Sequence, residues 1–160
     1  MSASLFDAIR KNNLAAVTSL LTEHPTLVNE KDQRGSTPLL LSTYYGSGDI
    51  AQAILKYDQN IDAQDASGNT ALMGVCFKGF EAIAQLLIDK GANVNTTNFN
   101  GATALIFAAT FAHASLIKLL IEKGANTEAR DDKGNRAIEH AKMQGLDEIV
   151  ALLDSTSHRD

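Results

Sequence analysis

The amino-acid sequence predicts an all-α solenoid, in which helix–turn–helix units stack and their connecting β-turns project as short fingers. One observation is a spacing of 33 residues that recurs for glycine, threonine and leucine. A second is that apolar residues fall at helical spacing twice within each period. The residues in register are Gly35, Gly68, Gly101 and Gly134; Thr37, Thr70 and Thr103; and Leu39, Leu72, Leu105 and Ile138. A fixed period of this length indicates a repeat array, whose units bury their apolar faces against one another.

Residues 4–31 form a degenerate first unit, which we expect to cap the N-terminal end of the array. The pattern predicts short helices over 5–13 and 14–25. Pro25 is expected to close the second helix, because proline cannot donate a backbone hydrogen bond. The predicted apolar stripe of that helix consists of Leu14, Val17, Leu20 and Leu21.

Residues 32–64 form the first full unit. We expect Thr37 to cap its first helix by accepting an early backbone N–H group. Pro38 then falls at the first helical position, where its missing N–H is no loss. Gly46 is predicted to end this helix, and a second helix is predicted over 49–57.

Asp58 is a position at which the first full unit departs from the next two. Gly91 and Gly124 stand there in the later units, directly after the second helix. A residue that follows a helix often has a positive φ, which aspartate tolerates less well than glycine. We therefore expect a positive φ at Asp58 and a weaker loop.

Residues 65–97 and 98–130 form the second and third full units, and the third has the clearest pattern. Its second helix is predicted over 114–124 and ends at Gly124. The residues predicted to be buried are Leu116, Ile117, Leu119 and Leu120, and those predicted to face water are Lys118, Glu122 and Lys123.

Residues 131–155 form a shortened last unit, followed by a predicted tail at 156–160. Three positions that are apolar in the inner units become polar here. Glu139 replaces Leu40, Met73 and Ile106; Lys142 replaces Cys76 and Ala109; and Asp154 replaces Ile88 and Ile121. The last unit of a stack has one face without a neighbour, so polar residues on that face indicate a C-terminal cap.

Composition and charge argue against two classes of partner. The net charge of −5 and the pI near 5.3 argue against nucleic acid, because affinity for phosphates depends on concentrated Lys and Arg. The apolar runs are far shorter than a membrane span, and the chain does not start with a basic segment followed by a long apolar one. We expect a cytoplasmic monomer that binds neither nucleic acid nor membrane.

No arrangement of side chains in the sequence predicts catalysis, a cofactor or a metal site. Cys76 lies in an apolar run and is interpreted as a small buried hydrophobe. The histidines, which lack partners at metal-ligand spacing, are His24, His113, His140 and His158. We interpret His140 as a solvent-exposed residue of the cap, and the acidic residues Asp131 and Asp132 as solvated turn residues.

Three segments share one signature, in which an acidic or amide residue is followed by glycine, threonine and leucine at fixed positions. DQRGSTPL begins the first full unit, DASGNTAL with LLIDKGANVN marks the second, and NFNGATAL with LLIEKGANTEA marks the third. On these motifs the chain resembles the ankyrin repeat family over essentially its whole length. It departs from the family pattern after the TPL triplet, where Leu40, Met73 and Ile106 replace the usual histidine, and it keeps the proline only at Pro38.

The resemblance implies a protein-binding scaffold without catalysis, substrate or cofactor. We consider first an adaptor or inhibitor that docks one partner protein through a concave groove. The alternative is a regulatory subunit that acts in trans on an enzyme encoded elsewhere. A third reading, that the chain is itself an enzyme, has no constellation of residues to support it.

In units of this kind, residues beside the turn glycine and residues late in the first helix face the groove. They are Gln33, Arg34, Ser36, Ala66, Ser67, Asn69, Phe99, Asn100, Ala102, Asp132, Lys133 and Asn135 in the turns, and Tyr44, Tyr45, Phe77, Lys78, Thr110, Phe111, Met143 and Gln144 in the helices. We call these twenty residues the groove set.

The groove set is rich in aromatic residues, since it holds five of the nine in the chain. Exposed aromatic side chains are typical anchors of protein interfaces, and cations often form the polar rim. The predicted partner-binding residues are Arg34, Tyr44, Tyr45, Phe77, Lys78, Phe99, Phe111 and Lys133. The alternative is that the rings turn inward and pack between units.

Overall fold

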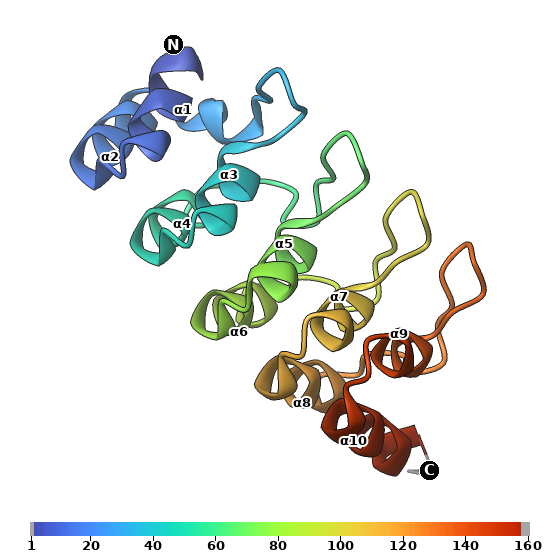
Figure 1. The fold of residues 1–160 in the computed structure, drawn as a ribbon. Coiled ribbons are helices and arrows are strands. Elements are labelled where there is room, and N and C mark those ends of the chain that lie inside the picture. Colours follow the sequence, from blue (N-terminus) through green and yellow to red (C-terminus); the bar gives the residue numbers. More distant parts are fainter. Residues whose placement is uncertain (1, 158–160) are drawn as a thin grey trace.

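The structure, a computed structural model, describes residues 2–157. These residues form ten α-helices and one 3-10 helix and contain no strand (Figure 1). The elements are α1 (Ser2–Arg10), α2 (Leu14–Glu23), η1 (Pro25–Asn29), α3 (Pro38–Tyr44), α4 (Gly48–Ile54), α5 (Ala71–Lys78), α6 (Glu81–Asp89), α7 (Ala104–Thr110), α8 (Ala114–Glu122), α9 (Ala137–Met143) and α10 (Asp147–Ser157). The predicted all-α solenoid is confirmed.

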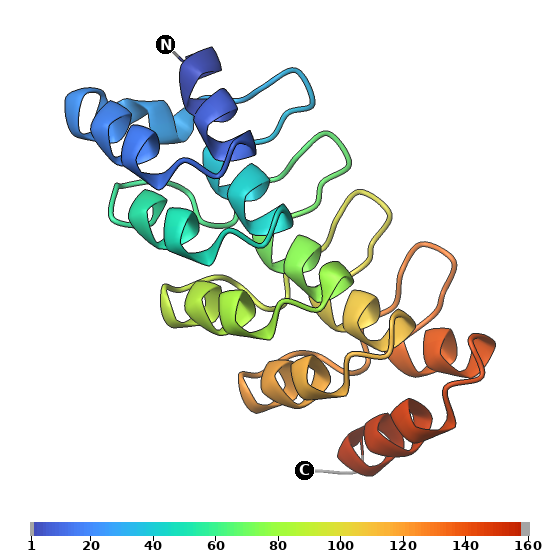
Figure 2. The same cartoon turned by 60° about the vertical axis from the view of Figure 1, so that its left-hand side comes forward.

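The helices are arranged in two rows that run along the stack (Figures 1 and 2). Each first helix packs on the first helix of the next unit, as α3 does on α5 and α5 on α7, and the second helices follow the same order. The connecting turns project beside the first-helix row and lie next to one another in both views. Apolar side chains from both rows form one continuous core, which includes Leu72, Leu105 and Ile117.

Threonine at the 33-residue spacing caps the first helices of the full units. The Oγ1 atoms of Thr37, Thr70 and Thr103 accept the backbone N–H three residues later, at 3.2, 3.3 and 3.2 Å. Pro38 follows Thr37 at the first helical position. All three threonines are buried, so the hydroxyl takes the place that water would have at an exposed helix start. The predicted cap at Thr37 is confirmed.

The glycines at the same spacing mark the turns that form the fingers. Their φ angles lie between 75° and 82°, in the left-handed region that favours glycine. Three residues before each glycine, one side-chain oxygen accepts the backbone N–H groups two and four positions further along; these residues are Asp32, Asp65, Asn98 and Asp131. Backbone bonds also join fingers, from Phe99 N–H to the Ser67 carbonyl at 3.2 Å and from Asp132 N–H to the Asn100 carbonyl at 3.0 Å.

The prediction of a positive φ at Asp58 is wrong. Within residues 2–157, the residues other than glycine that have positive φ are Asn12 and Ala112. Helix α4 ends at Ile54, earlier than the predicted end at 57, so the chain has already left the helix when it reaches Asp58. No left-handed residue is therefore needed at this position.

The side chain of Gln59 makes a hydrogen bond at the end of α4 that backbone N–H groups make after the second helices of the next two units. In the next two units, the carbonyls of Leu87 and Leu120 accept the backbone N–H groups of Ala92 and Ala125, both at 2.9 Å. Ile54 and Gln59 stand at these positions in the first full unit, and here the side-chain Nε2 of Gln59 donates to the Ile54 carbonyl at 2.8 Å. A side chain thus satisfies the acceptor that the backbone satisfies elsewhere.

The first unit differs from its predicted pattern at both ends of its second helix. Leu14 is 38% exposed, whereas Val17 is fully buried, so Leu14 does not belong to the buried stripe. Leu14 is the first residue of α2 and follows the exposed N-cap Asn13, which places it at the solvent end of the helix. Helix α2 ends at Glu23, and Pro25 begins η1, whose residues Leu27 and Val28 are buried.

The last unit has the polar surface that its sequence predicts, since Lys142 and Asp154 are exposed and Glu139 is half-buried. The tail differs from the prediction. Helix α10 continues through Ser157, so the segment predicted as a tail, 156–160, begins inside a helix. Residues 158–160, among them His158, lie outside the described residues.

Arg136 and Glu139 replace the threonine cap in α9. The Glu139 carboxylate accepts the backbone N–H of Arg136 at 2.8 Å and also pairs with its guanidinium. Glu128 pairs with the same guanidinium at 2.9 Å. The hydrogen bonds from Arg136 lower the pKa of Glu139 to about 2, against the opposing effect of partial burial. The start of this helix is therefore held by charges.

His140 and Asp131 also differ from their predicted roles, because neither is a freely solvated residue. Nε2 of His140 lies 2.6 Å from a carboxylate oxygen of Asp131, and the two side chains are only 20% and 11% exposed. Burial raises the pKa of Asp131, but hydrogen bonds from the Asn135 N–H, from His140 and from the Lys133 N–H together bring it below its usual value. The pair connects the fourth finger, the turn that begins at Asp131, to α9, which contains His140.

The apolar character of α5 explains the state of the single cysteine. Cys76 is fully buried, and burial raises the pKa of its thiol to about 12. The interpretation of Cys76 as a small buried hydrophobe is confirmed.

Although α5 and its neighbours are apolar, none of the helices between residues 2 and 157 is both long and apolar enough to span a bilayer.

Candidate binding surface

The ends of the first helices carry an exposed row of large side chains. Tyr44 is 46% exposed, Tyr45 51%, Phe77 38%, Phe111 44% and Met143 61%. These residues lie in the last turn of a first helix or at its C-cap, beyond the part of the helix that faces the core. The four predicted helix-end aromatic residues are therefore surface residues and are not enclosed between units.

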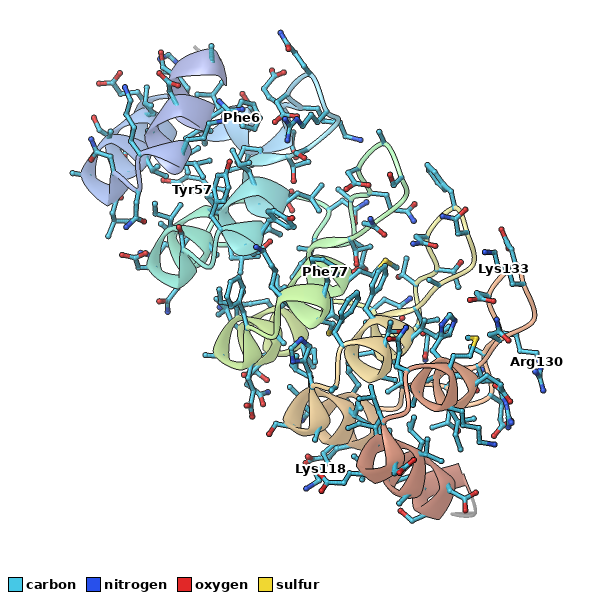
Figure 3. The ribbon with its side chains drawn as sticks, in the orientation of Figure 1. Phe6, Tyr57, Phe77, Lys118, Arg130 and Lys133 are labelled. Carbon is cyan, nitrogen blue, oxygen red and sulfur yellow. The ribbon has the colours of Figure 1, made fainter. Side chains whose placement is uncertain are left out.

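Phe77 is the centre of an aromatic cluster between the second and third full units (Figure 3). Its ring centroid lies 4.7 Å from that of Phe111 and 6.5 Å from that of Phe107, with interplanar angles of 76° and 85°. Both are edge-to-face arrangements, which aromatic rings favour. Phe107 is half-buried and packs against the exposed Phe77 ring. It was not among the predicted site residues, because its helical position indicates a core residue.

Tyr44 and Lys78 form a second contact between neighbouring units. Nζ of Lys78 lies 4.6 Å from the Tyr44 ring centroid, within the range of a cation–π interaction. Gly74 lies beside this ring, and a Cβ atom built there would be 3.9 Å from Cδ1 of Tyr44, an ordinary van der Waals distance. The Tyr45 ring is 6.3 Å from that of Tyr44. The predicted residues Tyr44, Tyr45 and Lys78 therefore lie together, and Lys78 joins them to Phe77, its neighbour in α5.

His113 supports this patch from the next unit. Its Nε2 lies 3.2 Å from the Phe77 carbonyl, which accepts a hydrogen bond from the ring. The ring also lies against Gly79, where a Cβ atom would be 2.6 Å from Cε1 of His113. Gly79 has φ of 85° and caps α5, so only a residue without a side chain fits there. His113 thereby positions the end of α5, which carries Phe77 and Lys78.

The groove continues into an open hollow of about 1350 Å³ at the N-terminal end of the stack. Helix α1, the first two fingers and the end of α3 surround it, and Tyr44 and Tyr45 lie on its wall. Arg10, in α1, lies 3.5 Å from the Asp32 carboxylate across this hollow. The sequence prediction included Arg34 but missed Arg10, because the degenerate first unit has no turn glycine from which groove positions are counted.

Phe99 and Lys133 lie on the fingers, apart from the helix-end patch. Phe99 is 66% exposed, and its ring covers Gly68 of the preceding finger, where a Cβ atom would be 2.6 Å from Cδ1 of Phe99. It borders a different hollow, of about 470 Å³, together with Val28 and Gln59. Lys133 lies on the fourth finger (Figure 3). The structure thus joins Tyr44, Tyr45, Phe77, Lys78 and Phe111 and leaves Phe99 and Lys133 outside that cluster.

A stack of helix pairs with projecting turns and one exposed aromatic row defines a helical repeat protein. Residues 5–98 match a family model described as ankyrin repeats (3 copies), and residues 87–141 match one described as ankyrin repeats (many copies). The chain therefore belongs to the ankyrin repeat family, as its motifs indicate. Ankyrin repeats are in general protein–protein interaction modules and are typically not catalytic. A comparison with curated proteins finds no match.

Proposed function

We propose that the chain is a non-catalytic adaptor or inhibitor that binds one partner protein through its groove. In this proposal Tyr44, Tyr45, Phe77, Lys78 and Phe111 form the main contact, and residues of the fingers extend it. The residues that extend it are Arg34, Phe99 and Lys133. The observation that carries the proposal is the row of exposed aromatic side chains, four of them within one patch.

The patch has the energetic properties of an interface anchor. Burying a large apolar side chain completely stabilises a complex by about 1.5–3 kcal/mol, so rings that are already half-buried contribute roughly half of that each. Phe107 packs against the Phe77 ring, and His113 bonds to the Phe77 carbonyl, so Phe77 is held in place before a partner binds. A preformed surface loses less conformational entropy on binding than a flexible one.

The test is a double substitution, Tyr45→Ala with Phe111→Ala, compared with the wild-type chain in affinity capture from the native host. We expect the double variant to lose the captured partner, because two anchors are gone. It should stay folded, with a loss of unfolding free energy of at most about 2 kcal/mol, since both rings are exposed and each takes part in one ring pair, Tyr45 with Tyr44 and Phe111 with Phe77.

Leu14→Ala is the matched control, because Leu14 is an exposed apolar residue of α2 outside the groove. It should leave capture unchanged. Retention of the partner by the folded double variant would contradict the proposal. A partner enzyme that co-purifies at fixed stoichiometry would favour the regulatory subunit over the adaptor, with the same surface in use.

A further inference from the structure

The groove set differs in charge from the rest of the chain. It contains three cations, Arg34, Lys78 and Lys133, and one anion, Asp132, although the chain as a whole carries a net charge of −5. None of the three cations forms an ion pair with any residue between 2 and 157. The groove therefore carries cations that lack counter-charges on a protein that is acidic elsewhere.

The acidic residues that lie near these cations are occupied by contacts within the protein. Asp32 accepts two backbone N–H groups and lies 3.5 Å from Arg10. Asp65 accepts two backbone N–H groups at 2.9 and 3.0 Å. Asp7, which also lines the N-terminal hollow, is 3.7 Å from Lys11. Asp7 and Asp32 therefore have cationic partners, and Asp65 has backbone donors only. Arg34 and Lys78 form no ion pair within residues 2–157, so both are open to a carboxylate of a partner.

Lys78 is next to Phe77 in the chain and joins the tyrosine contact to the pair formed by Phe77 and Phe111. It follows Phe77 in α5, and its Nζ is 4.6 Å from the Tyr44 ring centroid, while the Phe77 and Phe111 centroids are 4.7 Å apart. A partner that places a bulky apolar side chain on Phe77 and Phe111 therefore brings its neighbouring residues within reach of Lys78. Arg34 stands further along the groove, at the hollow that Tyr44 and Tyr45 also line.

We infer that the groove binds a partner segment in which Asp or Glu residues flank a bulky apolar residue. The apolar side chain rests on Phe77 and Phe111, one carboxylate pairs with Lys78, and a second reaches Arg34. Complementary charge fixes the register of such a segment and speeds its association. This inference rests on the proposed function and specifies the chemistry of its partner.

The experiment selects binders from a phage-displayed library of random linear peptides with the purified wild-type chain. Selected peptides should combine Asp or Glu with a bulky apolar residue. The charge-reversed variant Arg34→Glu with Lys78→Glu should bind them at least about tenfold more weakly, and their affinity for the wild type should fall as salt is added. Lys118→Glu with Lys123→Glu, the same change of charge in α8 and at its C-cap, should bind them like the wild type. Figure 3 shows Lys118 on α8, away from the fingers.

Four results would overturn the inference. Peptides that need Tyr45 and Phe111 but show no acidic bias, or that bind the charge-reversed variant equally well, refute the partner chemistry and leave the proposed function standing. Enrichment of no peptide, together with groove-dependent capture of a host protein, refutes a linear acidic segment in the same way. Failure of both the selection and the capture experiment overturns the inference and the proposed function together.

Discussion

The third full unit and the last unit follow the same chain path with different side-chain chemistry. In α7, the Thr103 hydroxyl caps the helix and Ile106 is buried. In α9, Arg136 and Glu139 occupy these two positions and pair with each other. His140 stands at the position that Phe107 has in the third full unit. His140 pairs with Asp131, whereas Phe107 packs against the Phe77 ring.

The difference shows how position in the stack selects the kind of interaction. A side chain between two units loses its water on both sides, and an apolar residue is then the most favourable choice. A side chain on the outer face of the last unit keeps water on one side, so a charged pair costs little desolvation there. Inner units should therefore respond mainly to changes in packing, and the last unit mainly to changes in pH.

The largest expected effect comes from removing packing at equivalent positions of α7 and α9. Leu105 is 1% exposed and Ile138 is 8% exposed. Leu105→Ala should lower the free energy of unfolding by about 3–5 kcal/mol, because neighbours on both sides keep the cavity open. Ile138→Ala should cost about 2 kcal/mol, since the end unit relaxes more easily. Urea denaturation followed by circular dichroism measures both, and equal losses would contradict the comparison.

A smaller effect, which depends on pH, is expected from Glu139→Gln. The pKa of Glu139 is about 2 in the folded chain, below its ordinary value of 4.5, so its ionised form stabilises the folded state. That stabilisation is complete above about pH 4.5 and disappears as the pH falls through about 2. The wild type should therefore unfold at a higher temperature than the variant at pH 7, by the equivalent of about 1–2 kcal/mol, and the gap should close in acid.

Thr103→Ala provides the control for this titration. The substitution removes the hydroxyl that caps α7. Because this cap contains no ionisable group, the free energy of unfolding should fall by about 1 kcal/mol at every pH. Asp131 is present in both the wild type and the Glu139→Gln variant, so its own titration cancels in the comparison. A gap between the wild type and Glu139→Gln that stays constant down to pH 2 would show that the charge of Glu139 does not hold the last unit.

The smallest effect is expected from Gln59→Ala, which compares the end of α4 with the ends of α6 and α8. The substitution removes the side-chain donor to the Ile54 carbonyl and should cost about 1 kcal/mol. Amide hydrogen exchange should speed up in α4 and remain unchanged in α8. Gln59→Glu keeps the length of the side chain but puts a carboxylate beside the Ile54 and Tyr57 carbonyls, so it should lower protection at least as much as Gln59→Ala. Retained protection in both variants would show that the bond is dispensable.

Much of the fold was predictable because repeated local features depend on residues close together in the chain. Thr37 caps a helix through an N–H group three residues away, and Gly35 allows a left-handed turn, so both effects appear in the spacing itself. The positions of Tyr45 and Phe111 after the end of a first helix were predictable in the same way, but the structure decided that their rings are exposed. Asp58 was mispredicted because the early end of α4 is not encoded in the repeat.

The sequence alone accounts for the period, the order of the helices, and the threonine caps and glycine turns that repeat in the inner units. The tertiary structure decided which residues from different units meet: Phe107 under Phe77, His113 against Gly79, and His140 beside Asp131. The physical reason is how far apart in the chain the interacting residues lie. A cap or a turn is complete within a few residues, whereas a contact between units depends on how their packed faces align, which a pattern repeated along one chain does not specify.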